Sequence, residues 1–417
     1  MKHEFNDVRA SCNHGPVTDE STSTALRWSM LAIALAATTS ANVFINGVAF
    51  LIPTLQSERG LNLASAGLLS SMAGFGLVVT LIAWGYVVDR IGERFVLAVG
   101  SALIAAATVG AAAVESLWAV GVFLFLGGMA AASSNSASGR LVVGWFPPNQ
   151  RGLVMGIRQA ATPLGVALGA LVIPRIAENY GVSAALLFPA AVCGISAVVC
   201  AVAVVDPPRP ARAEATHEVL ANPYRESGLL WRIHAVSVLL VVPQAVLWTF
   251  TLVWLMTERG WSAQSAGAMV TVAQVLGAGG RVAAGRWSDL LGSRLRPIRA
   301  IALAAAVTMG LFALTDWLDS PTSVALMVIA AVITVSDNGL AFTAIAEIAG
   351  PFWSGRALGT QNTSQHLASA VAAPLFGGLI GMVGYSAAFA VCALFPLVAV
   401  PVVPTDRTTF AKRTPGL

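Results

Sequence analysis

The sequence predicts an all-α integral membrane protein with twelve transmembrane helices in two pseudo-symmetric six-helix bundles. Hydrophobic residues make up 56% of the 417 residues and charged residues only 11%, too little charge to cover a soluble protein of this length. In lipid, only helices or closed barrels satisfy the backbone. The apolar runs reach eighteen residues or more, which favours helices over barrel strands.

A segment that occurs twice, two hundred residues apart, predicts the two related halves. The stretch from Gly85 to Arg94 returns from Gly285 to Arg294, and each copy ends a long apolar stretch. Two such halves are typical of membrane proteins built from internal repeats. The repeated residues are Gly85, Asp89, Gly92 and Arg94 in the first copy and Gly285, Asp289, Gly292 and Arg294 in the second.

Twelve apolar segments are each long enough to cross a hydrocarbon layer of roughly 30 Å. Tryptophans stand at many of the expected helix ends, as an aromatic belt at the membrane surfaces requires. In the first half the expected helices span 27–54, 63–85, 95–114, 118–144, 152–175 and 183–205. In the second half they span 231–256, 262–286, 297–316, 321–346, 355–381 and 384–404.

One long polar stretch, which begins at Asp206-Pro-Pro-Arg209, divides the two halves, because proline and charge end a helix and favour a solvated linker. The N-terminal residues lack the basic-then-apolar order of a signal peptide, so we expect them to remain as a tail. The expected organisation is a tail at 1–24, a first bundle at 25–205, a linker at 206–230, a second bundle at 231–404 and a tail at 405–417.

Almost all of the basic residues are arginines, and they gather in the tails and the even-numbered loops. By the positive-inside rule, this distribution places both termini in the cytoplasm. We therefore expect a multi-pass protein in the lipid bilayer of the plasma membrane, which in a bacterium is the inner membrane. Arginines spread over many loops do not predict a nucleic-acid partner.

The sequence has none of the patterns that carry enzyme chemistry. It contains no Gly-x-x-x-x-Gly-Lys loop for a nucleotide, no Cys/His spacing for a metal and no nucleophile elbow. We therefore expect no enzyme activity, no catalytic residues, no cofactor and no metal. The placing of the four cysteines indicates no disulfide framework.

The repeated Gly-x-x-x-Asp-x-x-Gly-x-Arg turn, after the second and the eighth expected helix, resembles that of the major facilitator superfamily, and the likeness covers nearly the whole chain. The resemblance implies a transporter whose two bundles rock around a central site, with helices 1, 4, 7 and 10 lining the cavity. The junction from Arg140 through Trp145-Phe146-Pro147 to Arg151-Gly152 resembles that of organic-anion carriers in the superfamily. We expect a small-molecule substrate and a monomeric functional unit.

The repeated turn is the candidate gate. Asp89 and Asp289 stand where a carboxylate can meet the positive N-terminus of a facing helix and an arginine. Such a contact exists in only one state of a rocking cycle, so it would act as a latch; the alternative is a solvated turn. The second copy has Leu290 where the family usually has a basic residue, which predicts a weaker latch. Arg140 is a candidate partner of Asp89, or a substrate contact.

Ionisable residues inside the membrane are costly and mark candidate functional sites. Arg158, with Gln159 beside it, lies in an apolar helix, and its own half has no obvious acid within the membrane. A guanidinium forks onto a carboxylate or phosphate, so this placing favours an anionic ligand. The alternative is that Arg158 extends to the headgroups. In the second half, Gln361 corresponds to Arg158. Asp337 could carry a proton and His366 could relay it; the alternative for both is a hydrogen bond between helices.

Other polar residues near the expected midplane could contact a small polar substrate, or could equally hydrogen-bond another helix. Arg281 is expected near the headgroups or the gate. The midplane candidates are Asn42, Asn46, Ser133, Ser134, Asn135, Gln244, Trp248 and Gln274.

These expectations combine into a secondary active transporter, coupled to protons, for a small organic anion such as a carboxylate. Arg158 would hold the anion and Asp337 the proton. One alternative is proton-driven efflux of drugs or metabolites, in which Asp337 would hold a cationic drug. A remote alternative is a membrane sensor that binds a metabolite without transporting it.

Overall fold

The structure, a computed structural model, describes residues 23–61, 63–209 and 220–405. Most of the expected N-terminal tail (1–22), the middle of the expected linker (210–219) and most of the expected C-terminal tail (406–417) lie outside the described residues. The described part of the chain is helical and has no strand, in agreement with the predicted all-α class.

The first bundle contains the helices up to residue 203. Its last helix, α7, has a break at Gly181, where φ is +80°, a value that glycine adopts readily. This break separates the two expected helices 152–175 and 183–205. The elements are α1 (Thr24–Gly47), the 3-10 turn η1 (Val48–Leu51), α2 (Ile52–Arg59), α3 (Leu63–Ile91), α4 (Glu93–Ala113), α5 (Leu117–Trp145), α6 (Arg151–Gln159) and α7 (Ala161–Ala203).

The second bundle repeats this plan. Its last helix, α15, has the same kind of break at Gly384, with φ +82°. A short helix of the linker, α9 (Pro223–Glu226), precedes the bundle. The bundle consists of α10 (Leu229–Thr257), α11 (Ala263–Leu291), α12 (Leu295–Trp317), α13 (Thr322–Val335), α14 (Asn338–Ala349) and α15 (Ser354–Val402).

Among the described residues, nine continuous helical segments are long and apolar enough to cross a membrane. Two of them, 151–203 and 354–402, contain the breaks at Gly181 and Gly384 and therefore cross twice. The 29 residues of α11 supply one further crossing, for twelve in all.

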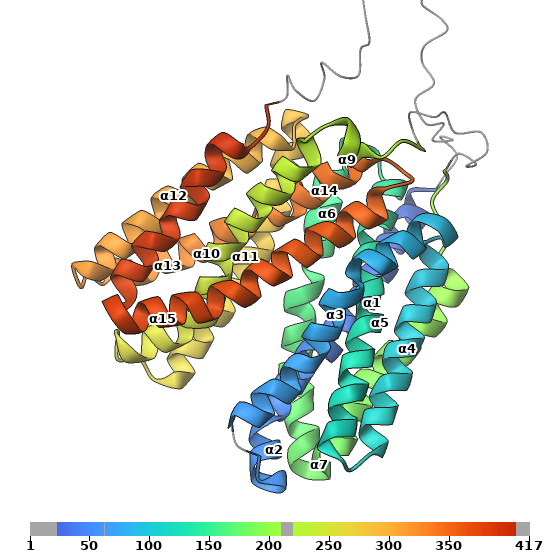
Figure 1. Ribbon diagram of the computed structural model, residues 1–417, viewed down its shortest axis with the longest axis horizontal. Helices are drawn as coiled ribbons and strands as arrows, with labels where there is room; N and C mark the ends of the chain where they lie inside the picture. Colours follow the sequence, from blue (N-terminus) through green and yellow to red (C-terminus); the bar gives the residue numbers. More distant parts are fainter. Residues whose placement is uncertain (1–22, 62, 210–219, 406–417) are drawn as a thin grey trace, which may run out of the picture.

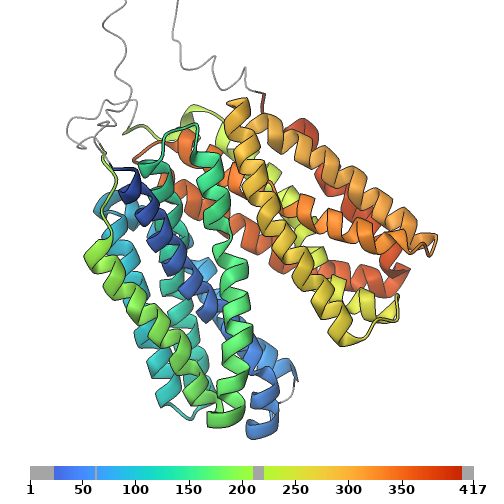
Figure 2. The ribbon, with the colours of Figure 1, turned by 180° about the vertical axis from the view of Figure 1, so that it is seen from behind.

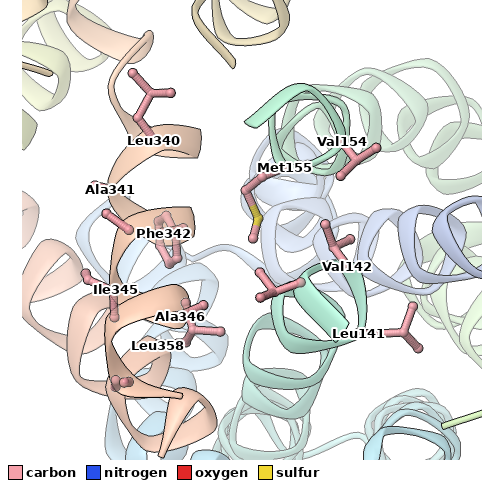
Figure 3. Packing of buried hydrophobic residues seen from close by; sticks show 14 of the residues in the cluster. Leu141, Val142, Val154, Met155, Leu340, Ala341, Phe342, Ile345, Ala346 and Leu358 are labelled. Carbon is pink, nitrogen blue, oxygen red and sulfur yellow. The ribbon is translucent and has the colours of Figure 1, made fainter. Parts of the chain in front are cut away.

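The two bundles meet at one end of the molecule and spread apart toward the other (Figures 1 and 2). We call the end where they meet the closed end. Helix α1 begins there and α15 ends there. The apolar core of the closed end is shared, because Leu141 and Met155 of the first bundle pack in one cluster with Leu340, Phe342 and Leu358 of the second (Figure 3). Each bundle also has an apolar core of its own.

Repeated glycines let the bundles approach closely at the closed end. A Cβ added at Gly85 of α3 would lie 2.3 Å from the Gly355 carbonyl oxygen of α15. In the other half, a Cβ at Gly285 of α11 would lie 2.1 Å from the Gly152 carbonyl oxygen of α6. Two helix pairs, α3 with α15 and α11 with α6, therefore form equivalent seams between the bundles.

Candidate functional site

The first carboxylate contact between the bundles is made by Asp89 at the end of α3. Its Oδ1 accepts a hydrogen bond from the Gly355 N–H at 2.8 Å, and its Oδ2 accepts one from the Arg356 N–H at 3.1 Å. The Arg356 guanidinium adds a bond from Nε at 2.9 Å. Because α15 begins at Ser354, these N–H groups belong to its first turn. The N–H groups of a first turn have no acceptor within their own helix, and they carry the positive end of the helix dipole. The geometry expected from the sequence is present.

Arg140 of α5 joins the same carboxylate from within the first bundle. Its Nη1 lies 3.2 Å from Asp89 Oδ1 and donates to the Val88 carbonyl at 2.6 Å. Its Nε lies 3.0 Å from Glu93 Oε1, and Glu93 is fully buried. These contacts assign Arg140 to the group around Asp89, which was one of its two expected roles.

The second carboxylate contact reproduces the first with the bundles exchanged. Asp289 at the end of α11 accepts hydrogen bonds from the Gly152 N–H at 3.0 Å and the Leu153 N–H at 2.8 Å, in the first turn of α6. Arg294 supplies the cation, with Nη1 at 2.6 Å from Asp289 Oδ1. Leu290, the residue expected to weaken this copy, is exposed and takes no part in these bonds.

The two repeated arginines differ in what they contact. Arg294 also pairs with Glu347 of α14 at 3.2 Å, and Arg151 of the other bundle approaches Glu347 at 3.5 Å. Arg94 instead donates to the Ala201 carbonyl of α7 at 2.8 Å, within its own bundle. Arg294 is therefore part of the seam, whereas Arg94 holds α4 against α7.

Arg158 lies at the end of α6, against polar groups of α5. Its Nε donates to Ser138 Oγ at 2.9 Å and its Nη2 to the Asn135 carbonyl at 3.1 Å. Its Nη1 donates to Gln159 Oε1 at 2.5 Å. The side chain is buried among these groups and does not extend to the headgroups. Within the described part of the chain, no carboxylate forms an ion pair with it.

Uncharged amides of three helices form a second polar group, in the second bundle. Asn338 Nδ2 donates to Gln244 Oε1 at 2.9 Å, and Gln365 Nε2 donates to Asn338 Oδ1 at 3.2 Å. These residues belong to α10, α14 and α15. Gln244 was expected at the site, whereas Gln365 was missed.

Asp337 and Arg281 are buried side chains of the second bundle. Asp337 lies at the break between α13 and α14, and the Arg281 guanidinium of α11 interacts with it electrostatically. Arg281 donates to the Val335 carbonyl and, across the seam, to the Gln159 carbonyl, both at 3.4 Å. Arg281 was expected near the headgroups or the gate, and its bond across the seam agrees with the second of these places. It does not lie at the headgroups, because the helix break and the seam surround it with buried acceptors.

Three other expected site residues form no hydrogen bond with Arg158 among the described residues. Asn42 and Asn46 donate to carbonyls of their own helix, at 2.8 Å and 3.0 Å. Trp248 lines a separate small pocket with Thr251 and Gln274 inside the second bundle.

Two side chains of α15 also differ from their expected places. Gln361 does not join Arg158, since its Oε1 lies 2.7 Å from His234 Nδ1 of α10. His366 is exposed on α15. Within the described part of the chain it makes no hydrogen bond with Asp337.

The residues that the sequence did not reveal share one property: their partners lie on other helices. Glu93 and Glu347 are acids near the ends of apolar helices, and that placing was the available signal. Arg356 stands next to a glycine, Gly355, in the first turn of α15. Arg151 likewise stands next to a glycine, Gly152, in the first turn of α6. His234 carries no local signal and is recognised only by its contacts.

The two bundles are joined through a repeated aspartate, and charged groups are buried between them. The sequence that forms them matches a known family. The family model of the Major Facilitator Superfamily matches residues 30–373. The chain belongs to this superfamily. As an MFS transporter it is a multi-pass membrane protein that moves a small-molecule substrate.

Some relatives of this MFS transporter align with most of its length and others with only a part of it. It is 59% identical to an uncharacterized MFS-type transporter of Mycobacterium tuberculosis over 378 residues. The aligned residues cover 91% of this chain and 85% of that protein. It is 32% identical over 155 residues to "Probable anion transporter 4, chloroplastic" of Arabidopsis thaliana, 37% of this chain and 28% of that one. It is 24% identical over 246 residues to the hexuronate transporter of Bacillus subtilis, 57% of this chain and 58% of that one.

Solved structures of MFS transporters share the fold. FucP in the outward conformation superposes with a TM-score of 0.70 at 17% identity, covering 93% of this chain and 99% of that one. The human organic anion transporter MFSD10 (TETRAN) superposes with a TM-score of 0.73 at 17% identity, covering 91% of this chain and 99% of that one.

Proposed function

We propose that this MFS transporter is a proton-coupled secondary active transporter of a small organic anion such as a carboxylate. The observation that carries the proposal is Arg158, a buried guanidinium without a paired carboxylate among the described residues. A buried charge without a counter-charge is costly, and a guanidinium binds carboxylate or phosphate in a forked geometry. An anionic ligand would supply the missing counter-charge.

Asp337 is the proposed proton carrier. It is a buried acid of the second bundle and lies at the break between α13 and α14. Taking up and releasing a proton would change the charge between the bundles during the cycle. Two MFS proteins of the same fold, FucP and XylE, are described as proton symporters, which supports this coupling.

Asp89 and Asp289 are the proposed gate. Both bind the first turn of a helix in the opposite bundle, so these bonds must break before the closed end can open. We place the closed end at the cytoplasm, because α1 begins there, α15 ends there and the arginine-rich turns after α3 and α11 lie there. The structure would then represent a state that is open to the outside of a bacterial inner membrane.

The names of some relatives support an anionic substrate. A plant relative is named as an anion transporter, one from Bacillus subtilis as a hexuronate transporter and a structural neighbour as an organic anion transporter. A hexuronate is a sugar that carries a carboxylate. These names agree with the chemistry inferred from Arg158.

A thermal-shift screen of the detergent-purified chain tests the proposal. Small carboxylates, phosphates, neutral sugars and lipophilic cations are compared, because a ligand at 100 times its Kd adds about 2.7 kcal/mol of stability. We expect stabilisation by carboxylates, lost in Arg158→Gln and retained in Arg175→Gln, which removes an exposed arginine of α7. Stabilisation by lipophilic cations alone would contradict the proposal and favour efflux.

A further inference from the structure

Three helices meet at one point between the bundles, close to Arg158. A Cβ at Gly156 of α6 would lie 2.6 Å from the Arg281 carbonyl oxygen of α11. A Cβ at Gly339 of α14 would lie 3.3 Å from the Gly156 nitrogen. The backbones of α6, α11 and α14 are therefore in direct contact, and the charged residues next to these glycines belong to one junction.

Two guanidiniums from opposite bundles contact the same residue of this junction. Arg158 of the first bundle donates to the side-chain oxygen of Gln159, and Arg281 of the second donates to its backbone oxygen. Both arginines are buried, with 3% and 4% of their surface exposed. Two like charges held together away from water require anionic groups nearby.

The protein supplies one of these anionic groups. The Asp337 carboxylate interacts with Arg281, while Arg158 is paired with no described carboxylate. With Asp337 ionised, the junction holds two positive charges and one negative charge. With Asp337 protonated, it holds two positive charges alone, one contributed by each bundle.

Among the described residues, no charged group besides Arg281 acts on Asp337. Helices α10 and α15 present the amides of Gln244 and Gln365, α5 presents Asn135 beside Arg158, and α12 packs apolar side chains such as Ile301 in the cluster around Leu340. Among the described residues, the charged group that interacts with Asp337 is therefore Arg281 of α11, and Arg158 of α6 contacts the side chain of the Gln159 that Arg281 also contacts.

We propose that Arg281 is a second anion-binding residue and that the site takes a small dianion such as a short dicarboxylate. One carboxylate of the ligand binds Arg158 and the other binds Arg281. Asp337 then no longer pairs with Arg281, and its carboxylate takes up one proton from solution. Two positive and two negative charges then remain, so proton uptake and dianion binding are coupled through Arg281. This inference rests on the proposed anion transport and names the substrate class of that site.

The test uses matched pairs of acids with equal numbers of carbons, such as succinate with butyrate and glutarate with valerate. Binding to the purified full chain is measured by calorimetry in buffers of different ionisation enthalpy, which reports the protons taken up. We expect a dicarboxylate to bind at least about tenfold tighter than the monocarboxylate with the same number of carbons. This ratio corresponds to the free energy of one charge-assisted hydrogen bond. We expect close to one proton per dicarboxylate and none per monocarboxylate.

Variants separate this inference from the proposed function. Arg281→Gln is expected to bring dicarboxylate affinity down to the monocarboxylate level and to leave monocarboxylate affinity within about twofold, since only one charged bond is removed. Arg158→Gln is expected to weaken both acids. Arg286→Gln, at an exposed position of the same helix, is the control and should change neither.

An unchanged preference for dicarboxylates in Arg281→Gln overturns the inference, as does the absence of any dicarboxylate preference in the wild-type chain. Unchanged binding of both acids in Arg158→Gln overturns the proposed function instead. If Arg281→Gln does not fold, Asp337→Asn decides, because it should bind dicarboxylates without proton uptake. Proton uptake that persists in Asp337→Asn overturns the inference.

Discussion

Asp89 of the first bundle and Gly355 of the second are joined by a hydrogen bond of 2.8 Å, from the first turn of α15 to the carboxylate. Asp289 and Gly152 repeat this relationship at 3.0 Å with the bundles exchanged. Each carboxylate thus lies at the positive end of a helix dipole in the other bundle. The closed end is held by two equivalent contacts and by the apolar cluster that the bundles share (Figure 3).

Asp89→Asn is expected to shift the protein toward the state in which the closed end opens. The amide keeps the shape of the side chain but loses the charge that two N–H groups and two arginines share, at a cost of about 1.5–3 kcal/mol. Spin labels on Tyr180→Cys and Met382→Cys, exposed next to the breaks at Gly181 and Gly384, would report a shorter distance between the bundles.

Glu258→Gln, an exposed acid at the end of α10, is the control for this experiment and should leave the label distance unchanged. An unchanged distance distribution in Asp89→Asn would show that the contact does not hold the closed end together.

Arg294→Gln and Arg94→Gln form a matched pair from the two repeats. Arg294 pairs with Asp289 and Glu347 at the seam, so its loss leaves the buried Asp289 without a cation and Glu347 with Arg151 alone, and it is expected to cost about 3 kcal/mol. Arg94 donates to a carbonyl of its own bundle, and its loss should cost about 1 kcal/mol. Thermal unfolding measures both, and the label distance should shorten only in Arg294→Gln. Equal effects on that distance would contradict the assignment.

Tyr224→Phe tests the attachment of the linker to the second bundle. The Tyr224 hydroxyl lies 2.9 Å from His234 Nε2, and burial raises the pKa of Tyr224, so the hydroxyl stays protonated and can donate. Because His234 Nδ1 faces Gln361 Oε1, its proton is expected on Nδ1, which leaves Nε2 as the acceptor. The variant should lose about 1 kcal/mol of stability in thermal unfolding at pH 8.

The difference between wild type and Tyr224→Phe should shrink at a pH low enough to protonate His234, since a doubly protonated ring cannot accept the hydroxyl hydrogen. Tyr180→Phe changes an exposed tyrosine and is the control at each pH. A stability difference that is the same at every pH would contradict the bond as described.

Much of the fold could be predicted from local patterns in the chain. Apolar length located the twelve crossings, and the positions of Gly181 and Gly384 agree with the expected turns between the last two helices of each bundle. The repeated turn predicted that Asp89 and Asp289 would meet helix N-termini, and Arg140 lies beside Asp89 as one interpretation required.

The candidate site could be predicted only in part. Arg158, Gln159 and Asn135 do come together, because they lie on adjoining helices of one bundle. For Arg281 the sequence left two places open, the headgroups or the gate, and its position at the seam depends on the break at Asp337 and on contact with the other bundle. Gln361 was assigned by its position in the repeat, but the unrepeated His234 binds it.

The sequence by itself determined that this protein is helical, membrane-spanning and built of two related halves, because hydrophobicity and repetition act along the chain. Only the tertiary structure decided which charges are compensated and which are not. Arg294 has Asp289 and Glu347, whereas Arg158 has uncharged partners from α5 and α6. A buried charge takes its counter-charge from whichever helix faces it, and that is settled only when the helices of both bundles pack.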